Sequence, residues 1–307
     1  MSRQKHHINK VSELLMLMRK SVTELQKNDP LRMAGATAFF ATFALPPMLI
    51  ILIRLFGLFI NRRVFVSGLF ARLPSLLDNS SVLQVRETLR NIRSINQQWY
   101  LALIGFIFFL FVASTLFNII KNSLEQIWKI ALRGKKSFAY TLKSRATSIV
   151  ILILAGFLFV ITLLTESIRT LFGNYVEQLW PVAGKLLNGI ANEILFLATV
   201  LIWFTVLFRM LTNGRPQWKI CFAGGALTAF LFTIGKYIVR YLLALSNIGT
   251  IYGTSGSVVL IMLFVFYSSI IFYYGACFVK VLSDHKASPI VPVEGAFNYE
   301  IQEVNAD

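Results

Sequence analysis

Histidine and cysteine are scarce in this 307-residue chain, and each shortage excludes a kind of chemistry. The three histidines, His6, His7 and His285, lie near the chain ends, so no zinc site of the usual histidine type can form between them. Cys221 and Cys277 have neither metal-type nor redox-type spacing. Phosphate-binding glycine loops, nucleophile elbows and kinase motifs do not occur. We therefore expect no enzymatic activity, metal or cofactor.

Charged residues are also few, at 14% of the chain, whereas 56% of the residues are hydrophobic and the mean hydropathy is +0.66. The hydrophobic residues form runs of roughly the 20 residues that a helix needs to cross a bilayer. These runs lack the alternation of barrel strands, so we predict an all-α polytopic membrane protein. The six expected transmembrane helices are Met33 to Ile60, Trp99 to Ile120, Thr147 to Thr165, Ile194 to Leu211, Ile220 to Leu243 and Ser255 to Leu282.

Acidic residues number 14 against 30 Lys and Arg, which leaves a net charge of +16. If the N-terminus is cytoplasmic, 19 of the basic residues lie in cytoplasmic segments and 8 in outer ones. Basic residues favour the cytoplasmic side, so both termini are predicted to be cytoplasmic. The basic residues cluster beside the spans, which indicates contact with the bilayer and its anionic lipids and not with nucleic acid.

The segments outside the spans differ in pattern. Residues 1–32 form a cytoplasmic N-terminal segment with an amphipathic helical pattern, which either lies on the membrane surface or packs against another helix. Residues 33–282 form the six-helix domain, with a helical periplasmic loop at about 61–98. In that loop Val82, Val85 and Leu89 form an apolar stripe beside a basic one, so the helix either rests on the outer surface or caps the bundle. Residues 283–307 are predicted to be a disordered cytoplasmic tail.

Charged side chains at membrane depth are costly and mark functional candidates. In the predicted topology, three cations and two carboxylates converge on the outer leaflet, namely Arg54, Lys236, Arg240, Glu166 and Glu193. One interpretation is an outward-facing polar cavity whose cations bind an anionic group such as a lipid phosphate. The alternative is that these long side chains merely reach the headgroups from helix ends. Small residues, such as Gly224, Gly225 and Ala229 in the fifth span and Gly35 in the first, are expected mainly to let helices pack closely.

Four segments carry recognisable motifs, namely AGATAFFATFALPPML (34–49), NSLEQIWK (122–129), GGALTAFLFTIGKYIVRY (224–241) and IYGTSGSVVLIMLFVFYSSIIFYYGACFVKVL (251–282). Taken together and in order, they resemble the YihY/BrkB family of bacterial inner-membrane proteins. The motif positions are Gly35, Pro46, Trp128, Gly225, Gly235, Tyr252, Gly253 and Gly275. The chain departs from the family pattern at Cys277, where the family usually has glutamate, and at Glu125, where it usually has asparagine.

The resemblance implies six helices in the bacterial cytoplasmic membrane and a link to the cell envelope, without a settled activity. An older ribonuclease label for the family finds no support here, because the chain has no carboxylate cluster for a two-metal nuclease. The resemblance also places Lys236 at the family's Gly-Lys position, which adds to its candidacy.

Two functions fit the sequence best. The first is a membrane protein that binds or translocates an anionic lipid or lipid-linked envelope precursor. The second is a non-transporting scaffold for cell-envelope proteins. A membrane-embedded enzyme is a weaker third, and the sequence predicts neither protein partners nor an oligomeric state.

Overall fold

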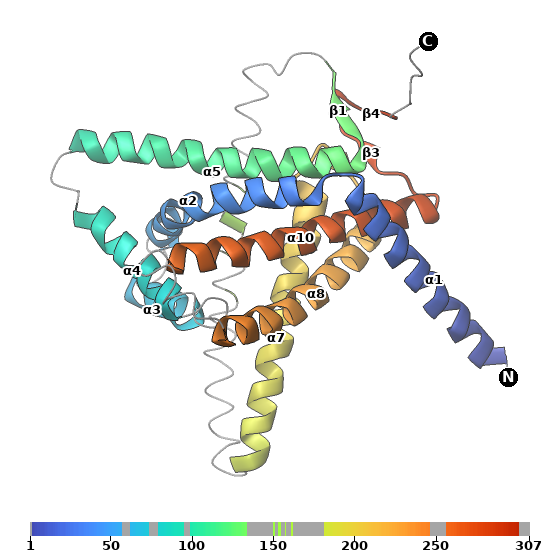
Figure 1. Cartoon of the computed structure of the whole chain (residues 1–307), viewed down its shortest axis with the longest axis horizontal. Coiled ribbons are helices and arrows are strands. Elements are labelled where there is room, and N and C mark those ends of the chain that lie inside the picture. The colour runs from blue at the N-terminus through green and yellow to red at the C-terminus, as the bar shows by residue number, and fades with distance from the viewer. Residues whose placement is uncertain are drawn as a thin grey trace.

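A computed structural model describes residues 2–56, 62–73, 79–94, 99–133, 150, 153, 154, 157, 161, 181–245 and 256–300 (Figure 1). Long helices make up most of these ranges: α1 (Ser2–Gln26), α2 (Pro30–Phe56), α3 (Arg62–Arg72), α4 (Asn79–Ser94), α5 (Trp99–Trp128), α7 (Pro181–Met210), α8 (Trp218–Leu245) and α10 (Gly256–His285). The strands are short: β1 (Ile130–Leu132), β2 (Gly214–Arg215), β3 (Val291–Pro292) and β4 (Ala296–Asn298).

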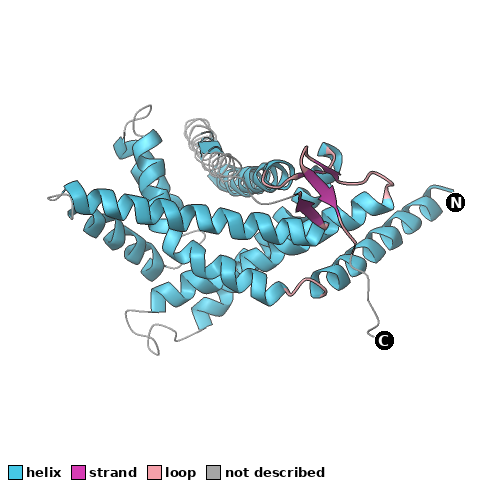
Figure 2. Cartoon of the chain, turned by 90° about the horizontal axis from the view of Figure 1, so that it is seen from above, coloured by secondary structure: helices cyan, strands magenta, loops and turns pink. Residues whose placement is uncertain are grey.

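Three of the long helices, α2, α5 and α10, run side by side through the middle of the molecule (Figures 1 and 2). Helix α8 packs against α10, and α7 packs against α8 while crossing behind the central helices at a steep angle (Figure 1). A helix satisfies its own backbone hydrogen bonds, which is why apolar runs of this length adopt it in hydrocarbon. The sequence prediction of a mostly helical membrane protein is confirmed.

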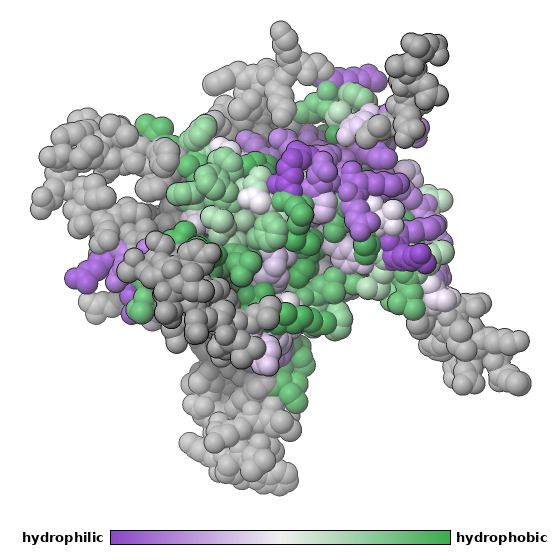
Figure 3. Space-filling model, in the orientation of Figure 1, coloured by the Kyte–Doolittle hydropathy of each residue, from purple (hydrophilic) through white to green (hydrophobic). Residues whose placement is uncertain are grey.

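Three of the described helices contain segments long and apolar enough to cross a membrane: Glu193–Met210, Trp218–Val239 and Val258–His285. They coincide with the last three predicted spans. The first two predicted spans fall largely within the helices α2 and α5, and the third, 147–165, lies almost wholly outside the described residues. Figure 3 shows hydrophilic side chains gathered where α5 ends and α2 begins, next to a surface of hydrophobic ones.

A sharp break separates α1 from α2. Asp29 has a φ of 50°, a left-handed conformation that aspartate tolerates better than most residues. The side-chain amide of Asn28 donates to the carbonyl of Glu24 and so satisfies one of the last carbonyls of α1. Pro30 then opens α2, where its missing N–H costs nothing. The chain can therefore change direction between the two helices within a few residues.

Helix α1 docks on the C-terminal half of α10. Leu17, Ser21 and Leu25 are buried along one face of α1, and the hydroxyl of Tyr274 donates to the carbonyl of Met18. Of the two positions expected for this segment, the structure shows packing against another helix. Leu15 and other apolar side chains of α1 nevertheless stay exposed.

Small residues allow the close packing around α8. A Cβ atom at Gly224 would collide with Val279 of α10, and one at Gly275 of α10 would collide with Thr228. On the face of α8 that packs against α7, a Cβ atom at Gly225 would collide with Thr205. The packing role predicted for Gly224 and Gly225 is confirmed, because each marks a place where two helix surfaces touch, and Gly275 has the same role. No described neighbour supports the same prediction for Gly35 of α2.

Helix α4 covers one end of the bundle. Val82 and Val85 are buried in a cluster with Leu49 and Ile53 of α2 and Ile261 of α10. The guanidinium of Arg86 lies over the ring of Phe70, 4.9 Å from its centroid. Within the described residues, the apolar stripe of α4 therefore packs on the bundle, as the second of its two alternatives predicted.

The predicted disorder of residues 283–307 is wrong for residues 283–300. Helix α10 continues to His285, and the chain then returns along the molecule as β3 and β4. Strand β4 pairs antiparallel with β1, which directly follows α5, and β3 pairs with β2 in the turn between α7 and α8. The two prolines and the glycine that suggested disorder are compatible with such short strands and turns. Pairing to distant segments, which composition does not reveal, orders this part of the tail.

Candidate functional site

Lys236 of α8 and Glu193 of α7 come together between their helices. The Lys236 Nζ atom lies 3.4 Å from Glu193 Oε2. The lysine side chain is only 8% exposed, whereas the glutamate side chain is 46% exposed. A charged amine in such a setting needs a counter-ion, because its removal from water is costly. The carboxylate supplies one from the more open side of the site.

Aromatic rings enclose the same ammonium group. Lys236 Nζ lies 4.1 Å from the centroid of the Phe196 ring and 4.7 Å from that of the Tyr237 ring. The negative face of an aromatic ring attracts a cation, most strongly where water is excluded. The site thus combines one buried cation, one half-exposed carboxylate and two ring faces.

The site lies far from the turn that joins α7 to α8. Lys236 is 18 residues beyond Trp218, and Glu193 is 17 residues before Met210, which corresponds to about 25 Å along either helix. Trp218 and Tyr241, both largely exposed, stand towards the two ends of α8. Aromatic side chains in such positions are typical of membrane-water interfaces. The pair therefore lies towards the ends of α7 and α8 that are far from the turn.

The structure tests the predicted five-residue cluster only in part. It brings Lys236 and Glu193 together. Glu166 lies outside the described residues, as do the side chains of Arg54 and Arg240, although their backbones belong to α2 and α8. The joint cavity of all five residues stays a prediction.

The family-motif positions have different structural roles. A Cβ atom at Gly235 would lie 2.8 Å from Cε2 of Tyr267, so this glycine joins Gly225 and Gly275 as a helix-packing position. A Cβ atom at Gly35 would meet no other atom within 4 Å, so no described neighbour requires a glycine there. Tyr252, Gly253 and the side chain of Pro46 lie outside the described residues.

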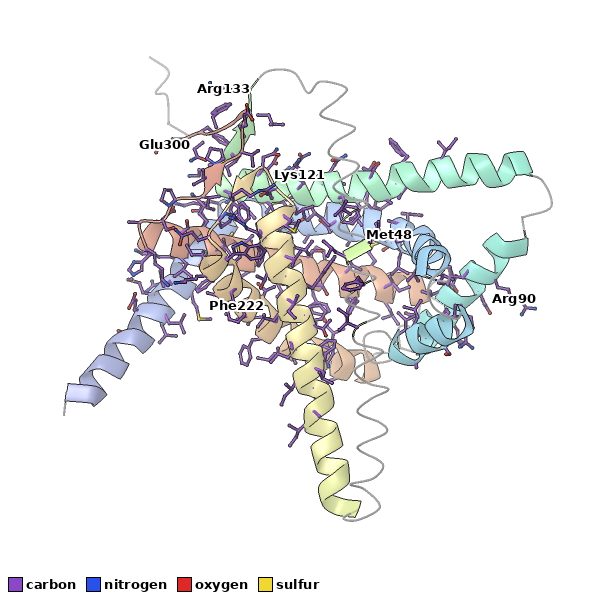
Figure 4. The ribbon with its side chains drawn as sticks, turned by 180° about the vertical axis from the view of Figure 1, so that it is seen from behind. Met48, Arg90, Lys121, Arg133, Phe222 and Glu300 are labelled. Carbon is purple, nitrogen blue, oxygen red and sulfur yellow. The ribbon has the colours of Figure 1, made fainter. Side chains whose placement is uncertain are left out.

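Trp128 belongs to a second polar cluster. Trp128 and Glu125 stand out in the sequence, but the sequence did not predict that they belong to one cluster. Its Nε1 atom donates to the carbonyl of Ala276 on α10 at 3.0 Å. One helical turn earlier, the buried carboxylate of Glu125 accepts hydrogen bonds from the backbone N and the Nδ2 atom of Asn213. Lys121, labelled in Figure 4, lies 3.9 Å from the same carboxylate. These groups hold the end of α5 to α10 and to the turn after α7.

Two buried hydroxyls extend this polar cluster into the bundle. The hydroxyls of Thr37 on α2 and Tyr273 on α10 lie 2.6 Å apart and share a hydrogen bond. The motif NSLEQIWK was the available signal for this region, because its polar residues recur at helical spacing beside a membrane span. Its partners on α2 and α10 could not be read from local spacing.

Arginines organise the turn between α7 and α8. Arg215 donates to the carbonyls of Arg209 and Thr212, and Arg209 donates to that of Pro216. Burial lowers the pKa of Arg215 from its usual value, and the charge of Arg209 lowers it further. The guanidinium of Arg209 also lies 5.4 Å from the ring centroid of Trp218. These contacts satisfy carbonyls at the end of α7 that have no partner within the helix.

Basic residues occur at both ends of the molecule. Figure 4 shows Arg90 projecting from α4 at the end opposite to Arg133 and Glu300, while Phe222 points outward from α8.

Among the described residues, no three histidine, cysteine, aspartate or glutamate side chains are grouped so that they could hold a metal ion. The described chemistry is that of buried cations, carboxylates and hydroxyls.

The comparison with known proteins agrees with the sequence motifs. Residues 21–292 match the family described as Virulence factor BrkB. The chain is 27% identical over 278 residues to a UPF0761 membrane protein of Teredinibacter turnerae, and the alignment covers 89% of this chain. It spans 61% of that relative's length. No solved structure matches the chain. The family match covers most of the sequence, and the chain is a multi-pass membrane protein that belongs to the BrkB family.

Proposed function

We propose that this BrkB-family protein binds an anionic lipid or a lipid-linked envelope precursor at Lys236 and moves it between the membrane leaflets. The observation that carries the proposal is the setting of the Lys236 ammonium. It is buried between two helices and faced by aromatic rings, and its carboxylate partner, Glu193, is half exposed.

In this proposal Glu193 occupies the position that a ligand phosphate takes. A separation of 3.4 Å is long for a charge-assisted hydrogen bond, so the pair is loosely held. Exchange of one anion for another keeps the lysine neutralised and avoids leaving a bare charge in a low-dielectric site. The exposed glutamate can turn into solvent when it is displaced. The acyl chains of the ligand would lie along the apolar surfaces of α7 and α8.

The proposal includes the topology expected from the basic residues. In this topology the protein has six spans in the bacterial inner membrane, with both termini in the cytoplasm. Arg209 at the end of α7 and Arg215 in the following turn then lie on the cytoplasmic side, and the Lys236 site lies near the outer interface about 25 Å away. An anionic headgroup can reach that site from the outer leaflet. The proposal contains no chemical reaction.

Lipid retention tests the proposal. The full-length protein would be purified in mild detergent, and the bound phospholipid would be measured by native mass spectrometry. Lys236→Ala is expected to lose most of the bound anionic lipid, because a hydrogen-bonded charge pair contributes about 1.5–3 kcal/mol, or roughly ten- to a hundredfold in affinity. The matched control is Lys280→Ala, since Lys280 of α10 also pairs with a carboxylate, Asp284, at 3.5 Å. Equal retention by both variants would contradict the proposal.

A scaffold role is the second candidate. Helix α1 supports it, because Leu14, Leu15 and Val22 remain exposed although the opposite face of the helix is docked on α10. The exposed side chain of Arg19 lies among them in the sequence. A wild-type protein that binds no anionic lipid, together with an unaffected Lys236→Ala variant, would favour this second candidate.

A further inference from the structure

The hydroxyl of Tyr267 on α10 is a buried polar group whose role the contacts of the described residues do not explain. Its oxygen atom is enclosed and makes no hydrogen bond to any residue in the described part of the chain. The next two residues behave differently, because the hydroxyls of Ser268 and Ser269 donate to carbonyls one turn back in the same helix. Buried hydroxyls nearly always have a partner, so an unpaired one calls for an explanation.

Tyr267 lies at the depth of the Lys236 site. Gly235, the residue before Lys236, is the position on α8 that faces the Tyr267 ring, where a Cβ atom would lie 2.8 Å from Cε2. Any larger residue at Gly235 would push the ring away from α8. The hydroxyl and the ammonium therefore belong to one level of the bundle, on the α10 side and the α7 side of α8.

A series of aromatic rings connects the two groups. The ring of Phe232 stacks on that of Tyr267, with centroids 6.4 Å apart, and on that of Phe196 at the same distance. Phe196 in turn carries Lys236 Nζ above its face. The side chains between the cation and the hydroxyl are thus aromatic. This arrangement fits a ligand with an anionic group, an apolar body and one uncharged hydrogen-bond acceptor.

We infer that the Tyr267 hydroxyl donates a hydrogen bond to an ester carbonyl of a glycerophospholipid whose phosphate is bound by Lys236. The inference rests on the proposed function and narrows its ligand class. Glycerophospholipids carry two ester carbonyls one glycerol unit below the phosphate, whereas inorganic phosphate has no such group. The oxygen of Tyr267 is enclosed, so the ligand enters between α8 and α10 as it binds.

A pair of lipids that differ only in the acceptor tests this inference. The full-length protein in detergent would be titrated with diester phosphatidylglycerol and with its diether analogue, with native mass spectrometry as the readout. The wild-type protein is expected to bind the diester about three- to tenfold more tightly, which is the contribution of one neutral hydrogen bond. Tyr267→Phe is expected to bind the two lipids equally. Equal binding by the wild-type protein, or a preference that survives in Tyr267→Phe, would overturn the inference.

Two further measurements separate the possible failures. The thermal midpoint of Tyr267→Phe should equal or exceed that of the wild-type protein, because the substitution removes an unpaired buried hydroxyl. Lys236→Ala should weaken binding of both lipids. If Lys236→Ala weakens binding of both lipids but Tyr267→Phe keeps the preference for the diester, only the inference about Tyr267 fails. If Lys236→Ala binds phosphatidylglycerol as tightly as the wild-type protein does, both the inference and the proposed function fail.

Discussion

Glu125 and Asn213, 88 positions apart in the chain, form a buried two-point contact. The Oε1 atom of Glu125 accepts the backbone N–H of Asn213 at 3.1 Å and its side-chain amide at 2.7 Å. The contact joins the end of α5 to the turn between α7 and α8. The carbonyl of Asn213 also accepts the backbone N–H of Val293, so the returning C-terminal segment is tied to the same point.

Loss of this contact should destabilise the protein. Glu125→Ala leaves two buried donors of Asn213 without their acceptor, which costs about 1–3 kcal/mol. Glu125→Gln keeps an oxygen acceptor and should cost less. The thermal midpoint of each purified variant in detergent would measure the difference. An alanine variant as stable as the wild-type protein would show that the contact contributes nothing.

The close approach of α8 and α10 at Gly275 gives a second prediction. Gly275→Ala forces its Cβ atom against the side chain of Thr228 and should destabilise the protein by about 1–3 kcal/mol. Adding Thr228→Ala should restore part of that loss, because it removes the hydroxyl that the new methyl group meets.

Gly35→Ala is the matched control for this experiment, since a Cβ atom there would meet no neighbouring atom of the described residues within 4 Å. It should leave stability unchanged or raise it by up to about 1 kcal/mol, the helix preference of alanine over glycine. The account of the small residues would be wrong if the two glycine substitutions had the same effect on the thermal midpoint.

The ordered C-terminal segment offers a third test with neighbouring residues. Ile290 is 6% exposed and belongs to the core cluster that contains Trp128 and Ile130, whereas Val291 is 60% exposed. Ile290→Ala should destabilise the protein by about 2–5 kcal/mol. Val291→Ala should change stability by no more than about 0.5 kcal/mol. Denaturant or thermal unfolding would compare them, and equal effects would mean that the segment is not anchored by Ile290.

The sequence was sufficient to predict the helical elements and to single out two residues that form an ion pair, but not the pairing itself. Runs of apolar residues identified the helices because burial in hydrocarbon depends on local composition. Counting basic residues placed Glu193 and Lys236 in one leaflet, and the structure brings them together. The same reasoning treated the tail after Leu282 as disordered, because Pro289, Pro292 and Gly295 weaken local structure. Its strands form only through pairing with β1 and β2, which are distant in the chain.

Other features also depend on contacts between helices. Glu125 is a helix residue like its neighbours until the turn at Asn213 is placed beside it. The unpaired hydroxyl of Tyr267 is likewise invisible in the sequence, where it is one aromatic residue among many in an apolar run. Local sequence patterns do not determine which side chains of two helices come into contact, and both features arise from such contacts.

The central claim is that Lys236 binds an anionic headgroup in competition with Glu193. The most direct measurement is a titration of phosphatidylglycerol into the full-length protein held in phosphatidylcholine nanodiscs, for wild type, Glu193→Gln and Lys236→Ala. Glu193→Gln removes the competing charge and should bind most tightly, the wild-type protein should be intermediate, and Lys236→Ala should bind most weakly, with about tenfold or more between the extremes. The same affinity in all three proteins, or weaker binding by Glu193→Gln than by the wild-type protein, would contradict the account.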